Sequence, residues 1–222
     1  EVINEAEMAY RLLPDDVTLI GITGTNGKTT TTTLTYEMIK RSGKRVHLAG
    51  NIGYPLCSFL EKLESGDIIV MEVSCQQLAN MKEFKPHIAL MTNLSEAHID
   101  FFGSYGAYKE DKLKIFNNQT EDDIAIVNIE NDDVMNGISN INSNVKYFSS
   151  KREINGAYFI DDKLYYYDEF IMNREEFLLK GNHNVENALG ALMIAKEVGV
   201  DNESIVSVLK TFTGVRHRLE FI

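Results

Sequence analysis

A glycine-rich turn with a lysine stands near the start of the chain, in the run Gly24-Thr25-Asn26-Gly27-Lys28-Thr29-Thr30. It follows the apolar stretch 17–22, whose β-branched residues predict a strand that is buried on both faces. Glycines let the backbone turn tightly and present its N–H groups, lysine adds a positive charge, and a threonine hydroxyl suits Mg²⁺. Together with the start of the following helix, these residue types predict a cradle for the phosphates of a nucleotide.

This turn is shorter than the general P-loop pattern, which places four residues between its first glycine and the Gly-Lys pair. The position of that first glycine is occupied by Ile22. An ordinary strand, turn and helix with a surface lysine is the alternative interpretation. However, threonine favours helices poorly. Helix propensity therefore does not explain why the run from Thr29 to Thr33 stands at a helix start. We expect a phosphate loop.

Composition and charge limit the classes of function. The 222 residues have a net charge of −11 and an ordinary globular composition, enough for one large or two small domains. The negative charge argues against nucleic acid or an anionic membrane as a partner, because such affinity comes from clustered Lys and Arg. Cys57 and Cys75 are too few for a disulfide framework, and no apolar run is long enough to span a membrane, so we expect a cytoplasmic protein. Because the chain begins at Glu1 without Met, we expect a piece of a longer protein.

Strands alternate with helices along most of the chain. This alternation predicts an α/β fold with a doubly wound, mostly parallel sheet. After Lys146, shorter runs separated by turns predict a small antiparallel flank, and helical periodicity then returns. The expected strands of the main sheet are 17–22, 45–49, 67–73, 88–92 and 124–128, and those of the flank are 147–148, 157–160, 164–167 and 177–179.

Several other polar residues lie at or just after the carboxyl ends of predicted strands, where parallel sheets gather their ligands. The carboxylate of Glu72 would hold magnesium opposite Thr29. Asn93 and His98 follow the next strand, and Asn51 lies in a Gly-Asn-Ile-Gly turn. Each also has a plainer interpretation, as a solvated acid, a packed histidine or a turn residue.

The chain carries a series of motifs in a fixed order, and together they resemble the central ATPase domain of the Mur ligases. These are ATP-dependent, amide-forming enzymes of peptidoglycan precursor synthesis. Without this resemblance, Lys112 would be interpreted as a solvated lysine, because its predicted helix is rich in charged residues. The matching motifs are the phosphate loop 24–30, Gly50-Asn51-Ile52-Gly53, Glu72-Val73-Ser74, the histidine motif 93–100, the modified-lysine helix 109–114, the adenine-side motif 181–188 and the junction His217-Arg218-Leu219-Glu220.

The resemblance implies a reaction and the residues that serve it. A carboxylate attacks the γ-phosphorus of ATP, and an amine displaces the resulting acyl phosphate. Lys28 and the loop amides would hold the β- and γ-phosphates. Thr29 and Glu72 would hold one magnesium ion, and His98 with a carbamylated Lys112 would hold a second ion near the substrate carboxylate.

The resemblance also implies roles for residues outside the phosphate loop. Asn184 and Asn187 would contact the nucleotide, and Arg218 would reach the phosphates. Asn51 and Ser74 would lie on the substrate side of the site. Residues 1–214 would form the central ATP-binding domain, and residues 215–222 would begin a linker to a C-terminal domain that this sequence lacks.

Within the family, the stretches 72–78 and 213–220 are most similar to the members that add D-glutamate to UDP-N-acetylmuramoyl-L-alanine. Those members usually have Ser-Phe-Gln where this chain has Cys75-Gln76-Gln77. Another Mur ligase therefore stays an alternative, as does a ligase of the folylpolyglutamate synthase type, although the loop of the latter typically ends in Gly-Lys-Gly. A GTPase would need an Asn-Lys-x-Asp motif, which this sequence lacks.

The domains that hold the UDP group and the incoming amino acid are not in this sequence. We therefore expect the chain alone to be inactive as a ligase, or to act only as a nucleotide-binding module. We further expect it to be a monomer, with small molecules and its own missing domains as partners.

Overall fold

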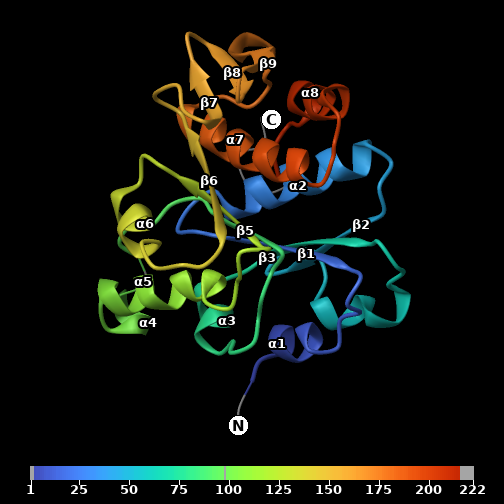
Figure 1. Ribbon diagram of the computed structural model, residues 1–222, viewed down its shortest axis with the longest axis vertical. Coiled ribbons are helices and arrows are strands. Elements are labelled where there is room, and N and C mark those ends of the chain that lie inside the picture. Colours follow the sequence, from blue (N-terminus) through green and yellow to red (C-terminus); the bar gives the residue numbers. More distant parts are fainter. Residues whose placement is uncertain (1–2, 98, 216–222) are drawn as a thin grey trace.

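The computed structural model describes residues 3–97 and 99–215. In this part of the chain, nine strands form one twisted sheet between two layers of helices (Figure 1). The strand order is β2-β3-β1-β4-β5-β6-β7-β8-β9. The strands are β1 (Thr18–Thr23), β2 (Val46–Gly50), β3 (Ile68–Glu72), β4 (Ile88–Met91), β5 (Ile124–Asn128), β6 (Asn144–Ser149), β7 (Gly156–Ile160), β8 (Lys163–Tyr166) and β9 (Glu169–Asn173).

The strand order reverses at β1. This strand pairs in parallel with β3 on one side and with β4 on the other. The chain leaves it toward one edge of the sheet through β2 and β3, and toward the other edge through β4 and β5. The predicted doubly wound sheet is confirmed, and the glycine-rich turn lies at its switch point, where such sheets bind ligands.

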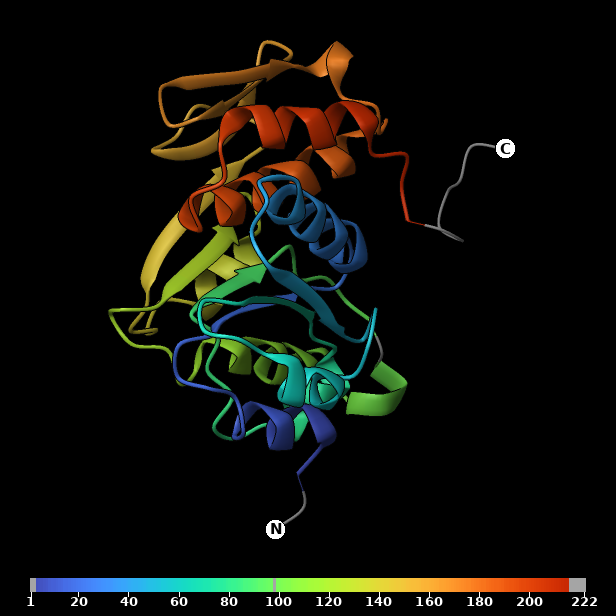
Figure 2. The ribbon, with the colours of Figure 1, turned by 90° about the vertical axis from the view of Figure 1, so that its right-hand side faces the viewer.

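Each face of the sheet has its own apolar core. Alternate residues of β1 point to opposite faces, so Ile20 belongs to one core and Leu19 to the other. The first core packs under α2 (Lys28–Arg41), α7 (Asn182–Glu197) and α8 (Asn202–Thr211), which lie above strands β1 to β5 in Figures 1 and 2. Gly190 lets α7 approach the sheet closely, because a Cβ there would lie 2.9 Å from Cδ1 of Leu90.

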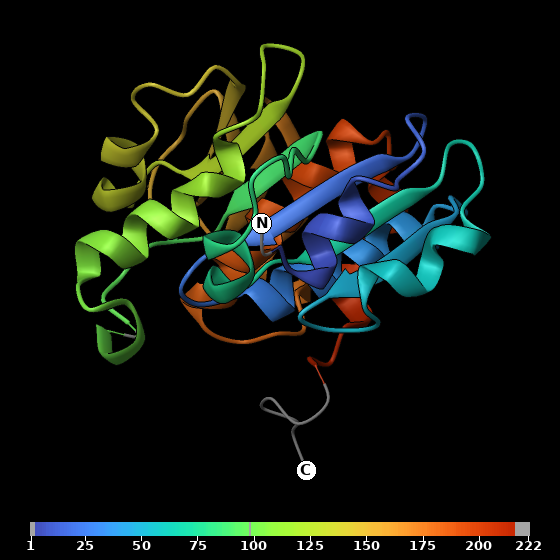
Figure 3. The same cartoon turned by 90° about the horizontal axis from the view of Figure 1, so that it is seen from below.

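The second face carries shorter helices, which Figure 3 shows in front of the strands. Here residues 56–62 form a 3₁₀ segment. No helix of the described residues is both long and apolar enough to span a membrane. The elements on this face are α1 (Glu5–Tyr10), η1 (Leu56–Lys62), α3 (Cys75–Ala79), α4 (Ile99–Phe102), α5 (Tyr105–Leu113), η2 (Lys114–Phe116) and α6 (Asp132–Gly137).

The predicted antiparallel flank is confirmed, but it begins later in the chain than the sequence indicates. Strands β6 and β7 pair in parallel, and only the β7–β8 and β8–β9 pairs are antiparallel. The turn between β7 and β8 consists of Asp161 and Asp162 with φ of 49° and 56°, the left-handed geometry that tight hairpins require.

The strand predicted at 177–179 is not formed, and β9 takes its place in the sheet. After β9, the 3₁₀ segment η3 (Arg174–Glu176) leads into this stretch. Phe177 is buried in the core, and the N–H of Leu178 donates to the carbonyl of Leu209 in α8. The apolar run therefore reflects packing beside α8 rather than strand pairing.

Asp67 ties together the amino end of the sheet. Its buried carboxylate accepts hydrogen bonds from Nε of Arg45 at 3.1 Å, from Nε2 of His47 at 2.7 Å and from the N–H of Glu64 at 3.0 Å. Burial acts to raise the pKa of Asp67. The hydrogen bonds from Glu64 and His47 and the charges of His47 and Arg45 outweigh burial, so this pKa lies below its usual value.

We expect Asp67→Asn to lower the free energy of unfolding at pH 7 by roughly 1–3 kcal/mol, because the charged hydrogen bonds are lost. A carboxylate whose folded pKa is depressed stabilises the fold above its unfolded pKa of about 4, and this contribution fades as the pH falls through the folded pKa. Urea unfolding followed by circular dichroism at several pH values measures it. The difference from the wild type should shrink below about pH 4. A pH-independent difference, or an equal effect of the exposed control Asp122→Asn, would contradict this.

Candidate functional site

The phosphate loop joins β1 to the start of α2. Gly24 and Gly27 adopt φ of +144° and +82°, conformations that favour glycine. A Cβ on Gly24 would collide with the hydroxyl of Thr92, and one on Gly27 would collide with Oδ1 of Asn187. Gly27 is also the N-cap of α2 and provides no side-chain cap, so the helix start is suited to an anion.

Asn93 shapes the exposed part of this loop. Its side-chain Oδ1 accepts from the N–H of Asn26 at 2.9 Å, and its Nδ2 donates to the carbonyl of Asn26 at 3.1 Å. The Asn93 carbonyl accepts from the N–H of Thr25 at 2.9 Å. The amides of Thr25 and Asn26, both predicted to bind phosphate, are thus engaged within the protein. In the first turn of α2, Nζ of Lys28 donates to the carbonyl of Thr25 at 2.9 Å. Phosphate binding by Lys28, Thr29 and Thr30 stays a prediction.

Two asparagines of α7 support the loop from the opposite side. Oδ1 of Asn187 accepts from the hydroxyl of Thr31 at 3.3 Å, and its Nδ2 donates to Oδ1 of Asn184 at 3.2 Å. Nδ2 of Asn184 in turn donates to the carbonyl of Lys180 at 2.7 Å. Both residues are buried, and Asn187 packs beside Gly27 and α2. Their contact with a nucleotide stays a prediction.

Glu72 ends β3 directly beside Ile22 of β1. The residue is 1% exposed, and Nδ2 of Asn51 donates to its Oε1 at 2.9 Å. Its second oxygen, Oε2, is buried and has no hydrogen-bond partner among the described residues. A buried carboxylate oxygen without a partner is costly, and a bound cation would remove that cost.

The oxygen donors here suit Mg²⁺, which prefers carboxylates and phosphates. The hydroxyl-bearing Thr29 is buried at the start of α2, the helix that follows β1, and β1 pairs with the strand that ends at Glu72. No group of three His, Cys, Asp or Glu side chains in residues 3–97 and 99–215 is placed to hold a metal ion. Two of the predicted site residues, His98 and Arg218, lie outside the described residues.

Lys112 is 2% exposed, which excludes the interpretation as a solvated lysine. Its Nζ donates to Oγ1 of Thr23 at 3.4 Å and lies 5.2 Å from the centre of the Tyr108 ring. Burial lowers the pKa of Lys112 to about 8, and the charge of Lys28 acts in the same direction, while Cys75 and Glu72 act against it. Burial therefore raises the fraction of neutral amine near neutral pH above that of an exposed lysine.

The Cys75-Gln76-Gln77 segment has a structural role. Ser74 is the N-cap of α3, where its Oγ accepts from the N–H of Gln77 at 3.2 Å and Oε1 of Gln77 accepts from the N–H of Ser74 at 2.9 Å. The thiol of Cys75 donates to the carbonyl of Tyr108 at 3.6 Å, and burial raises the pKa of Cys75 to about 11. The segment therefore caps α3 and docks it on the helix that carries Lys112.

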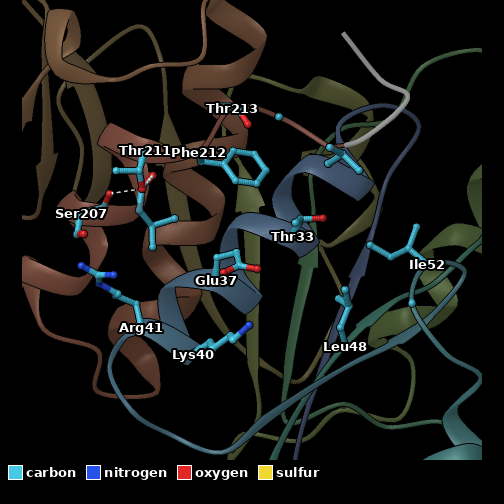
Figure 4. A pocket seen from close by; sticks show the side chains of 14 residues that line it. Thr33, Glu37, Lys40, Arg41, Leu48, Ile52, Ser207, Thr211, Phe212 and Thr213 are labelled. Atoms are coloured by element: carbon cyan, nitrogen blue, oxygen red, sulfur yellow. Dashed lines mark hydrogen bonds between the residues drawn. The ribbon is translucent and has the colours of Figure 1, made fainter. Parts of the chain in front are cut away.

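A groove of about 720 Å³ lies beside the C-terminal half of α2 (Figure 4). Residues of β2 and α8 and residues 212–215 also line it. It contains none of the residues predicted from the sequence to form the site. Its lining mixes charged, polar and apolar side chains, among them Thr33, Glu37, Lys40, Arg41, Leu48, Ile52, Ser207, Thr211 and Phe212.

Comparison with known proteins decides the family. The protein-family model described as "Mur ligase middle domain" matches residues 22–195. The chain belongs to the Mur ligase family. It is 46% identical over 221 residues to UDP-N-acetylmuramoylalanine--D-glutamate ligase of Lactococcus lactis subsp. lactis (strain IL1403) and 43% identical over 222 residues to that of Geobacillus sp. (strain WCH70). All of this Mur ligase chain is matched, but it spans only 49% of each relative's length.

Solved Mur ligases share the fold. MurF from Acinetobacter baumannii superimposes with a TM-score of 0.76 at 21% identity, over 98% of this chain and 51% of MurF. MurF from Thermotoga maritima, solved in complex with ADP, gives a TM-score of 0.69 at 21% identity, over 95% of this chain and 52% of that one. These likenesses confirm the predicted Mur ligase architecture.

We expect Glu72→Ala to weaken ATP binding in the presence of Mg²⁺ by at least about tenfold, because the carboxylate that is predicted to hold the ion is lost. Binding in EDTA should change little. Calorimetric titration of ATP under both conditions measures the two affinities, with Glu61→Ala as an exposed control. An equal loss with and without Mg²⁺ would show that Glu72 acts only on the fold.

Proposed function

We propose that this chain is the ATP-binding central domain of a ligase that adds D-glutamate to UDP-N-acetylmuramoyl-L-alanine. The reaction forms an amide bond and converts ATP to ADP. It is a step of peptidoglycan precursor synthesis. One observation supports the proposal: a helix start without a side-chain cap, a buried carboxylate whose second oxygen has no partner among the described residues, and a buried lysine lie at the switch point of a Mur ligase sheet. Identities of 43–46% to relatives named for this activity support the choice of amino acid.

The phosphate loop would bind ATP and hold its terminal phosphates for transfer. Lys28 would contact the β- and γ-phosphates, beside the N–H groups at the start of α2. Thr29 and Glu72 would hold Mg²⁺. Bound Mg²⁺ would offset phosphate charge and help to align the γ-phosphate with the substrate carboxylate. Asn93 and Asn187 would keep the loop in shape, because each contacts it directly.

Lys112 would act after modification. CO₂ adds to a neutral amine, and the lowered pKa of Lys112 supplies that form. The product is a carboxylate, the kind of oxygen ligand that magnesium prefers, whereas the free ammonium would repel the ion. With His98, a carbamylated Lys112 would hold a second magnesium ion near the substrate carboxylate.

The rest of the assignment follows the family. Asn184, Asn187 and Arg218 would contact the nucleotide, and Asn51 and Ser74 would face the substrate. Residues 1–214 would form the domain, and 215–222 would begin the linker to a C-terminal domain. The chain spans about half the length of its curated relatives, so N- and C-terminal domains would supply the UDP site and the amino-acid site. The enzyme would work as a monomer in the cytoplasm, where its free thiols Cys57 and Cys75 stay reduced.

A direct test is phosphate release by the full-length ligase, supplied with ATP, Mg²⁺, UDP-N-acetylmuramoyl-L-alanine and one amino acid at a time. D-glutamate should support turnover, and L-lysine and D-alanyl-D-alanine should not. The 222-residue chain alone should bind ATP without forming the amide, because misplacing reacting groups by about 1 Å costs about a hundredfold. Turnover with another amino acid instead of D-glutamate would show that the protein has the activity of a different Mur ligase.

Lys112→Ala in the full-length ligase should abolish most activity, and short-chain carboxylic acids should partly restore it by supplying the missing oxygens. Lys109→Ala, on the same helix, is the control and should keep its activity. ¹³C-labelled bicarbonate should give a carbamate carbon signal in the wild type that is absent from Lys112→Ala. Full activity of Lys112→Ala would contradict the role of Lys112. So would equal losses of activity in Lys112→Ala and Lys109→Ala that no carboxylic acid restores.

A further inference from the structure

The amine of Lys112 is held at a single polar atom. Among the described residues, the one hydrogen-bond partner of its Nζ is Oγ1 of Thr23, at 3.4 Å. The nitrogen also lies over the Tyr108 ring, 5.2 Å from the ring centre. No carboxylate of residues 3–97 and 99–215 forms an ion pair with Lys112.

The hydroxyl of Thr23 can only accept from Lys112. Thr23 is fully buried at the end of β1, and its Oγ1 lies 2.8 Å from the carbonyl oxygen of Val73. A carbonyl oxygen has no proton to give, so the single hydroxyl proton of Thr23 points to Val73. The Thr23 oxygen then offers lone pairs alone to the lysine nitrogen.

We propose that Thr23 is the positioning residue for carbamylation of Lys112, because it accepts one N–H of the lysine nitrogen both before and after CO₂ is added. This inference rests on the modified Lys112 of the proposed function. In the addition, the nitrogen lone pair forms a bond to the carbon of CO₂, and one C–O π pair moves onto oxygen. One proton leaves the nitrogen for solvent. The carbamate keeps a single N–H, which matches the single acceptor.

The hydrogen bond would also orient the product. A carbamate is planar, so fixing Cε and the N–H direction fixes the plane in which the two new oxygens lie. Thr23 directly precedes Gly24 of the phosphate loop, and Val73 directly follows Glu72. The hydroxyl that holds the lysine nitrogen is therefore anchored between the phosphate loop and the magnesium carboxylate.

A hydroxyl suits this task better than a carboxylate. An acidic partner would stabilise the ammonium form, which cannot attack CO₂. The Thr23 contact is long for a hydrogen bond, and the Thr23 oxygen carries no charge. It can restrain the nitrogen without keeping it protonated.

The test uses the full-length ligase and ¹³C-labelled bicarbonate. Thr23→Val removes the hydroxyl and keeps the branched shape, and Thr23→Ala removes it without adding a methyl group. Thr23→Ser keeps the hydroxyl and is the matched control. The carbamate carbon signal of Lys112 is measured while the CO₂ concentration is raised, and the melting temperature is recorded for each variant.

We expect the CO₂ concentration for half-modification to rise roughly 2- to 10-fold in the valine and alanine variants, the effect of losing one hydrogen bond. Thr23→Ser should match the wild type. The activity of the valine and alanine variants should recover as bicarbonate is raised, which a purely structural defect would not do. A wild-type protein without the carbamate signal would refute the modified lysine itself. A wild-type signal with the same CO₂ dependence in all the variants would refute only the role of Thr23.

Discussion

The buried carboxylate of Glu72 is the constraint on which the rest of this site depends. Its Oε2 has no partner in the described structure, and the equally buried amine of Lys112 has one long hydrogen bond. Such groups destabilise a fold unless a ligand completes them, and unsatisfied polar groups of this kind concentrate at functional sites. The apolar cores on both faces of the sheet offset the cost, and they place both groups at the end of β1.

The loop between these groups has no comparable shortage of partners. Asn93 holds its exposed side through the backbone of Asn26, and Asn187 packs against Gly27 from α7. A phosphate loop that is fixed before the nucleotide arrives loses little conformational freedom on binding, and this favours both affinity and alignment. The structure therefore combines a loop that is held by the protein itself with incompletely satisfied polar groups around it.

Local patterns explain which parts could be predicted from the sequence. The turn 24–30 and the alternating strands and helices carry strong local signals, and both were predicted correctly. The parallel pairing of β6 with β7 and the failure of 177–179 to form a strand depend on contacts with distant elements, such as the one between Leu178 and Leu209. The burial of Lys112 is equally non-local, because its helix is rich in charge, and only the family resemblance singled it out. Asn93 was noted after its strand, but nothing local revealed that it pairs with Asn26.

The central claim is that ATP binds at the start of α2, and both ends of this helix carry a lysine that tests it. Lys28 lies at the phosphate loop, whereas Lys40 lines the groove of Figure 4. Calorimetric titration of MgATP should show an affinity roughly 10- to 100-fold lower for Lys28→Ala, the effect of losing a charged hydrogen bond, and an unchanged affinity for Lys40→Ala. Unchanged affinity of a folded Lys28→Ala protein, or a loss confined to Lys40→Ala, would contradict the account.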